Sequence, residues 1–312
     1  MVACGDGGAA PVTPPSSPPG EGTPSLGAGG SLSGRSVFPA TDAWNTAVDQ
    51  APVDSASGRL IAAIGGGAPL HPDFGASYNG GPFGIPYIVV DGATAPVPVT
   101  FGYADESDPG PYPIPPGAPI EGGSAATGDR HVLVIDRDRW RLYELYAARP
   151  SGAGWAAGSG AVFDLSAGTT RPAGWTSADA AGLPIFPGLV RHDEVVERGA
   201  ILHALRFTVA RTRRAYIAPA RHYASGSTDP TLPPMGMRVR LKANVDISGY
   251  PPSARVILTA LKRYGMILAD NGSNWYLSGA PDARWNDTDL DTLKQLTGDD
   301  FEVVRMGPLV TS

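Results

Sequence analysis

The stretch HVLVIDRDRWRLYELYA, residues 131–147, contains two runs of β-branched and aromatic residues separated by three charged residues. Valine, isoleucine, tyrosine and tryptophan favour strands. The connection at residues 137–139 is short enough to force the two runs to pair in opposite directions. We therefore expect an antiparallel hairpin with one strand at residues 131–136 and the other at residues 140–147.

Runs of the same kind continue on both sides of this hairpin. They lie at residues 86–91, 97–103, 161–165, 201–209, 214–219, 237–242, 266–269, 275–277 and 301–304. The turn Asp270-Asn271-Gly272 predicts a second hairpin, which would join the strands at 266–269 and 275–277.

Helical patterns are fewer, at residues 54–64, 253–264 and 289–296. The clearest one has Val256, Ile257 and Leu261 on one face and Gly265 at its end. Because strands do not alternate regularly with helices, a doubly wound fold is not expected. The pattern favours a mainly β fold, an antiparallel, jelly-roll-like β-sandwich with a few peripheral helices.

The first 36 residues differ from the rest in composition. Ala3-Cys4-Gly5 resembles the end of a lipoprotein signal peptide. The residues that follow, up to Ser36, are rich in glycine, proline and serine and include no aromatic residue. Such a segment buries too little apolar surface to offset its chain entropy. We therefore expect residues 1–36 to be a disordered tether acylated at Cys4, and residues 37–312 to be one β-rich domain. The alternative is an accidental early cysteine.

Composition excludes several classes of function. The 24 lysines and arginines against 30 acids give a net charge of −6, which argues against nucleic-acid binding. Cys4 is the only cysteine, so the folded part has no disulfide and no thiol nucleophile. Phosphate-binding loops, the zinc-protease motif, the serine-hydrolase elbow and the dinucleotide fingerprint are all missing. We expect no cofactor and no metal.

Three stretches resemble a group of secreted bacterial proteins, mostly without assigned function. They are LHPDFG at residues 70–75, ADAAGLP at residues 178–184 and YGMILADNG at residues 264–272. The likeness spans most of the folded part. It implies export and a single domain, and it implies no site residues.

Carboxylates and histidines are the candidate catalytic residues. Glu144 shares its strand face with Trp140, Leu142 and Tyr146, and an acid among aromatic rings has a raised pKa and can donate a proton. The alternative for Glu144 is a surface salt bridge to a hairpin arginine. We predict a cleft roofed by the irregular segments 105–123 and 175–189. Its catalytic residues would be Glu144, Asp164 or Asp179, and at least one of His71, His131 and His222.

Basic and aromatic side chains are the candidate substrate-binding residues. Arg238 and Arg240 alternate along one strand face, which is either a solvated outer face or a groove for an acidic polysaccharide. Tryptophans can stack on sugars but are equally explained by packing. The predicted binding set is Arg206, Arg238, Arg240, Tyr223, Trp140, Trp175 and Trp275.

Together these features predict a carbohydrate-active protein outside the cytoplasm, anchored to the bacterial membrane or cell surface only by lipid at Cys4. We expect a monomeric polysaccharide-degrading enzyme, either a glycoside hydrolase or a lyase that acts on an acidic polysaccharide. The alternative is a non-catalytic glycan-binding or adhesion lipoprotein. This prediction of function is based largely on analogy with other proteins of the predicted fold class.

The lipid anchor is directly testable. When the full gene is expressed from any upstream start, we expect the wild-type protein in the membrane fraction and Cys4→Ser in the soluble fraction, because the substitution removes the acylated thiol. Equal recovery of both proteins from membranes would rule out the anchor.

Overall fold

The computed structural model describes residues 21–168 and 171–311, and it is mainly β-sheet, as expected. The sheet order β1-β5-β7-β8-β11 forms a five-stranded sheet. Its strands are β1 (Gly27–Ala28), β5 (Tyr87–Val90), β7 (Val132–Asp136), β8 (Arg141–Tyr146) and β11 (Ser159–Asp164).

A six-stranded sheet has the order β16-β13-β14-β12-β15-β2. Its strands are β2 (His71–Asp73), β12 (Leu205–Val209), β13 (Arg238–Leu241), β14 (Met266–Asn271), β15 (Tyr276–Ser278) and β16 (Phe301–Val303). Two smaller sheets complete the described strands. One consists of β6 (Val99–Phe101), β10 (Gly154–Ala157) and β9 (Arg149–Ser151), and the other of β3 (Gly75–Tyr78) and β4 (Gly81–Phe83).

The hairpin predicted at residues 131–147 is confirmed. Strands β7 and β8 pair antiparallel, with Leu133 opposite Glu144. Every residue of β7 is buried. Its alternate residues enter two different cores: Leu133 and Ile135 belong to the main core, whereas Val132 and Val134 belong to a smaller one on the opposite face of the sheet.

Strand pairing is not antiparallel throughout. Among the described strands, four pairs are parallel: β5 with β7, β6 with β10, β12 with β14, and β2 with β15. The turn at 270–272 does reverse the chain, but β14 and β15 do not form the expected hairpin because β12 lies between them. A turn motif determines that the chain reverses its direction, but it does not determine which strand pairs with the one before the turn.

The stretch 214–219 was also predicted as a strand, and this was wrong. It contributes only isolated bridges of Tyr216, to Met235 and to Val310. The remaining predicted runs coincide with strands, with shifts of a few residues at their ends.

The three expected helices are present as α1 (Ser57–Ile64), α2 (Pro252–Arg263) and α3 (Asp287–Asp291). Short 3-10 helices lie at Ala104–Glu106, Phe186–Gly188, Thr292–Gln295 and Gly298–Asp300, and a π-helix lies at Asp193–Arg198. No helix in the described part of the chain is long and apolar enough to cross a membrane.

The boundary placed at residue 37 was wrong for part of the N-terminal segment. Residues 1–20, including Cys4, lie outside the described residues. Residues 21–36, however, belong to the fold: β1 pairs with β5, and Leu32 is buried. Asp193 accepts hydrogen bonds from the Ser31 hydroxyl and the Leu32 amide. Backbone pairing and one buried leucine therefore order a segment whose composition suggested disorder.

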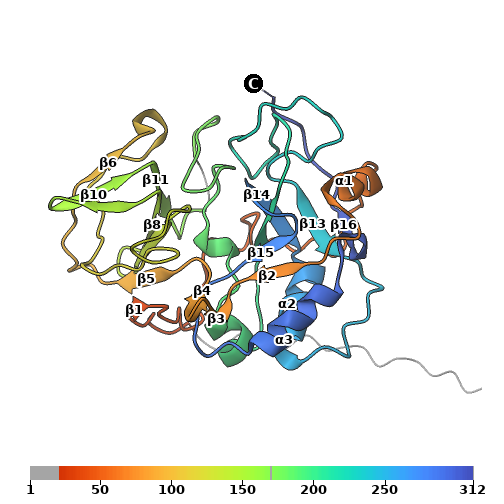
Figure 1. Ribbon diagram of the computed structural model, residues 1–312, viewed down its shortest axis with the longest axis horizontal. Coiled ribbons are helices and arrows are strands. Elements are labelled where there is room, and N and C mark those ends of the chain that lie inside the picture. Colours follow the sequence, from red (N-terminus) through yellow and green to blue (C-terminus); the bar gives the residue numbers. More distant parts are fainter. Residues whose placement is uncertain (1–20, 169–170, 312) are drawn as a thin grey trace, which may run out of the picture.

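Figure 1 shows the five-stranded and three-stranded sheets on one side of the molecule and the six-stranded sheet with α1, α2 and α3 on the other. We call these the N-terminal half and the C-terminal half. Strand β2 lies at the edge of the six-stranded sheet.

Helix α2 provides a test of the core of the C-terminal half. Leu261 is fully buried on α2, in the main core. Leu261→Ala should lower the free energy of unfolding by about 2–5 kcal/mol, because it removes a buried side chain and leaves a cavity. Denaturant unfolding measures this. Thr259→Ala, on the exposed face of the same helix, serves as the control, and equal stability of the two variants would contradict the packing.

Candidate functional site

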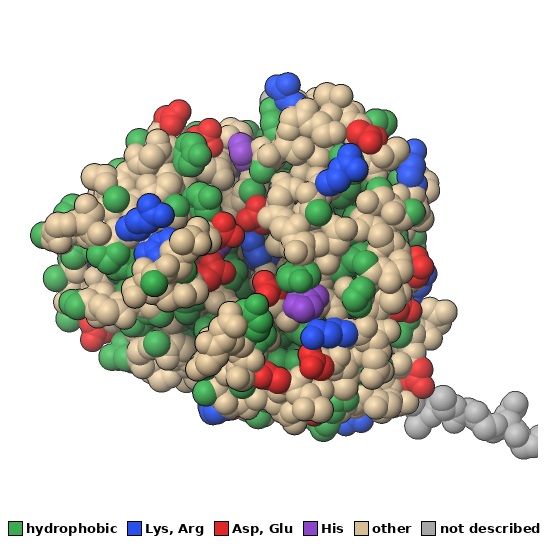
Figure 2. All heavy atoms as spheres, in the orientation of Figure 1, with side chains coloured by type: hydrophobic (Ala, Val, Ile, Leu, Met, Phe, Trp, Pro, Cys, Tyr) green, Lys and Arg blue, Asp and Glu red, His purple; other side chains and the backbone are tan. Residues whose placement is uncertain are grey.

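A cleft of about 1440 Å³ lies between segments of both halves. Figure 2 shows acidic side chains gathered around a hollow between the two parts of the molecule. Residues 117–124 of the N-terminal half and β2 of the C-terminal half both line it. The acidic residues among its lining are Asp73, Glu121, Asp287 and Asp291, and its aromatic residues are Phe74, Tyr78, Phe83, Trp155 and Tyr276.

Glu121 is held in the cleft by His131. The Nδ1 atom of His131 donates to the Glu121 carboxylate at 2.6 Å, and the Glu121 amide donates to the His131 carbonyl at 3.0 Å. The His131 Nε2 atom, on the other side of the ring, lies 3.1 Å from the carbonyl oxygen of Ala178. The His131 side chain is only 2% exposed, whereas that of Glu121 is 25% exposed.

This ion pair shifts the pKa values of both His131 and Glu121. The Glu121 carboxylate raises the pKa of His131 to about 9 despite the opposing effect of burial. Burial also opposes ionisation of Glu121, but the His131 charge and hydrogen bonds outweigh it and lower the pKa of Glu121. At neutral pH the pair is therefore a buried imidazolium and a carboxylate that is open to the cleft.

Asp73 lies at the end of β2 and is exposed to the same cleft. Desolvation raises the pKa of Asp73, and the charge of Glu121 adds to this rise, although His71 opposes it. No hydrogen bond or ion pair joins the side chain of Asp73 to another described residue, although its backbone pairs with β15. Its carboxyl group is consequently free to contact a ligand.

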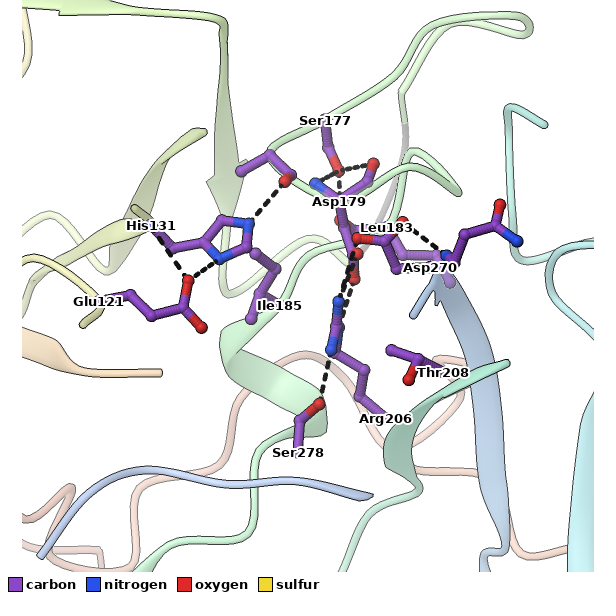
Figure 3. A network of polar contacts seen from close by, with 12 residues as sticks. Glu121, His131, Ser177, Asp179, Leu183, Ile185, Arg206, Thr208, Asp270 and Ser278 are labelled. Atoms are coloured by element: carbon purple, nitrogen blue, oxygen red, sulfur yellow. Dashed lines mark hydrogen bonds and ion pairs between the residues drawn. The ribbon is translucent and has the colours of Figure 1, made fainter. Parts of the chain in front are cut away.

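A second buried ion pair joins Arg206 and Asp179, as Figure 3 shows. Arg206 on β12 donates to both carboxylate oxygens of Asp179, from Nε at 2.6 Å and from Nη2 at 2.7 Å. Its Nη1 atom donates to the Ser278 hydroxyl at 2.5 Å. Asp270, at the end of β14, lies 3.5 Å from Nη2. Desolvation and the nearby Asp179 charge raise the pKa of Asp270 well above its usual value.

The predicted catalytic residues do not all meet in one cleft. His71 lines the cleft, whereas His131 and Asp179 lie outside its lining, in the network of Figure 3. Asp164 lies elsewhere, exposed, and accepts hydrogen bonds from Ser166 in its own turn. His222 bonds through Nδ1 to the Ala180 carbonyl. Of the two irregular segments, part of 105–123 lines the cleft, whereas residues 177–190 are almost entirely buried.

Glu144 is fully buried and has no arginine partner among the described residues. Its carboxylate accepts hydrogen bonds from the backbone amides of Ile185 and Phe186, at 2.9–3.0 Å. Burial raises the pKa of Glu144 to about 7 against the effect of these two bonds. The rise was expected, but its cause is desolvation inside the core rather than a wall of aromatic rings around a cleft.

Most predicted substrate-binding residues have structural partners. Arg238 donates to the carbonyl oxygens of Tyr264, Ala43 and Thr46, and Arg240 pairs with Glu302. These arginines attach the segment around residues 43–51 to β13. They form neither a solvated face nor a groove, because this same segment covers that face of the strand.

The predicted aromatic residues lie outside the cleft lining as well. Trp140 and Trp275 are buried, and Trp175 is half-buried beside Arg171. Tyr223 stacks on His222 and receives a hydrogen bond from Arg214. Trp155 is the tryptophan that lines the cleft.

The sequence analysis did not select Glu121 of the cleft or Asp270 beside Arg206. Glu121 lies in a glycine- and proline-rich loop, and Asp270 belongs to a sequence that is typical of a turn. The one available indication was the length of the loop at 105–123, because long loops in a compact domain are often functional.

In the described part of the chain, no three histidine, cysteine or acidic side chains are arranged to hold a metal ion.

Glu144→Gln tests the burial of this carboxyl group. A raised pKa in the folded state means that the stabilising contribution is complete below the unfolded value of 4.5 and is lost as the pH rises through about 7. We expect the stability difference between the variant and the wild type to change by about 1–3 kcal/mol between pH 4.5 and 7.5.

Denaturant unfolding at several pH values measures this difference. Asp246→Asn is the control. Asp246 is exposed, and its hydrogen bonds to Ser248 lower its pKa, so this substitution should change the pH dependence of stability only at acid pH. Parallel profiles for wild type and Glu144→Gln would show that Glu144 titrates as it does in the unfolded chain.

Comparison with known protein families, curated proteins and solved structures finds no match to this chain.

Proposed function

We propose that this protein binds a polysaccharide in the cleft and hydrolyses its glycosidic bonds, with Glu121 and Asp73 as the catalytic pair. The observation that carries the proposal is the presence of two carboxyl groups, one from each half, whose pKa values are displaced in opposite directions. Two carboxyl groups whose surroundings move their pKa values apart can serve as a general acid and a general base at the same pH.

Hydrolysis of a glycosidic bond needs these two functions and no cofactor. Asp73, whose pKa is raised, would donate its proton to the leaving oxygen as the bond between that oxygen and the anomeric carbon breaks. Glu121, kept ionised by His131, would act on the anomeric carbon either by accepting a proton from the attacking water or by attacking first itself. Water completes both routes, and its hydroxyl group ends on the released sugar.

The charge of the cleft favours hydrolysis over elimination. A lyase that acts on an acidic polysaccharide needs a cation that neutralises the uronate carboxylate. The cleft is lined by four carboxylates and one lysine, Lys294, whose Nζ lies 2.6 Å from Asp291. Arg206 is matched by Asp179, and Arg240 by Glu302. These contacts support an uncharged glycan as the substrate.

The second candidate function is a non-catalytic glycan-binding or adhesion protein. Tyr78, Phe83 and Trp155 on the cleft walls support it, because aromatic side chains provide flat apolar surfaces. Export as a Cys4-anchored lipoprotein, a monomeric state and a jelly-roll-like sandwich all stay predictions that accompany either function.

The catalytic pair is tested by incubating the purified protein with a panel of neutral polysaccharides and measuring reducing ends. We expect turnover by the wild type and losses of about 10²–10⁴-fold in kcat for Glu121→Gln and Asp73→Asn, the usual effect of removing a positioned acid or base. Asp246→Asn, an exposed acid outside the cleft, should retain full activity.

Retention of activity by both Glu121→Gln and Asp73→Asn would overturn the assignment. Binding of a glycan without release of reducing ends would favour the adhesion function instead. Circular dichroism on each variant separates a loss of chemistry from a loss of fold.

A further inference from the structure

We propose that the stacked rings of His71 and Tyr276 form a platform on which one uncharged pyranose residue of the glycan packs, directly beside the bond that is broken. This inference rests on the proposed function in that it takes the ligand of the cleft to be a glycan. It adds a binding subsite and identifies the residues that would determine specificity there.

The platform is built by two neighbouring parallel strands. His71 of β2 and Tyr276 of β15 are directly paired in the sheet register. Their rings stack with centroids 4.1 Å apart and an interplanar angle of 19°. Both residues are half-buried and both line the cleft. Because stacking covers one face of each ring, the pair offers a ligand an outer ring face that the other ring supports, and the backbone of two strands fixes its position.

The position of the platform relative to the proposed acid follows from strand geometry. Asp73 lies two residues after His71 on β2, so both side chains project from the same face. Two residues of strand span about 6.6 Å, which is close to the length of one sugar residue. A pyranose ring on the platform would therefore present its linkage to Asp73.

The chemistry at the edges of the platform suits a sugar. One face of a pyranose is a flat array of C–H groups, which packs well on an aromatic ring, while its hydroxyl groups point outward in the ring plane. The Lys294–Asp291 ion pair lines the same cleft and offers charged hydrogen-bond donors and acceptors for such hydroxyl groups. Burial and the Lys294 charge lower the pKa of His71, so the stacked imidazole is uncharged at neutral pH.

Tyr276→Ala and Tyr276→Phe form a matched pair of variants. The first removes the ring and the second keeps it, since the proposed contact uses the ring face and not the hydroxyl group. Both are made in the Glu121→Gln background, so that binding is measured without turnover. The probes are hexasaccharides of glucose, xylose, mannose and N-acetylglucosamine, and isothermal titration calorimetry gives Kd.

We expect at least one hexasaccharide to bind, Tyr276→Ala to weaken its binding by about tenfold or more, and Tyr276→Phe to change it by less than about twofold. His71→Ala, on the edge strand β2, is the second truncation and should also weaken binding. It keeps the test decisive if Tyr276→Ala unfolds, which thermal melting reveals.

The outcomes separate this inference from the proposed function. Equal binding by the Ala and Phe variants overturns the platform, even if the wild type cleaves the probe. Platform-dependent binding without cleavage by the wild type overturns hydrolysis and leaves the platform in place. Absence of binding and cleavage for every probe and polysaccharide in the panels rejects both.

Discussion

The bidentate ion pair between Arg206 and Asp179 is the constraint on which the rest of the site depends. Both groups are buried, and a buried charge without a partner is strongly destabilising. Here the guanidinium meets both oxygens of Asp179 and the Ser278 hydroxyl, so its charge and three of its donors are matched. The pair fixes the buried segment 177–190 against the six-stranded sheet, and this segment is what the N-terminal half then bonds to.

The same segment holds the N-terminal half through polar contacts from β8, from β11 and from His131, which directly precedes β7. Glu144 accepts bonds from the amides of Ile185 and Phe186, Ser159 donates to the Ser177 carbonyl, and His131 reaches the Ala178 carbonyl. A residue that looks catalytic by sequence is therefore a structural anchor. The same connection orients His131, and through it Glu121, so the geometry of the cleft depends on bonds that no ligand touches.

Features that depend on the local sequence pattern could be predicted, whereas features that depend on tertiary contacts could not. The hairpin at 131–147 and helix α2 follow from the periodicity of the sequence. A raised pKa of Glu144 was also expected, but it comes from burial in the core and not from neighbours in the chain. The position of β12 between β14 and β15 does not, because a turn motif carries no information on which strand is inserted. Glu121 was missed for a related reason: its ion pair with His131 joins residues ten apart across a loop with no periodic pattern.

Charge balance explains why carboxyl groups in and around the cleft have pKa values displaced in different directions. Behind and around it, two buried cations, His131 and Arg206, face Glu121, Asp179 and Asp270. His131 is matched to Glu121 and Arg206 to Asp179, so Asp270 is left over, and desolvation together with the nearby Asp179 charge raises its pKa. The pKa of Asp73, which desolvation raises against the effects of His71 and Arg206, shifts in the same direction, while the pKa of Glu121 shifts in the opposite one. The one acid in excess of these two cations is thus Asp270, outside the cleft lining, while on the cleft itself the pKa values of Asp73 and Glu121 are displaced in opposite directions.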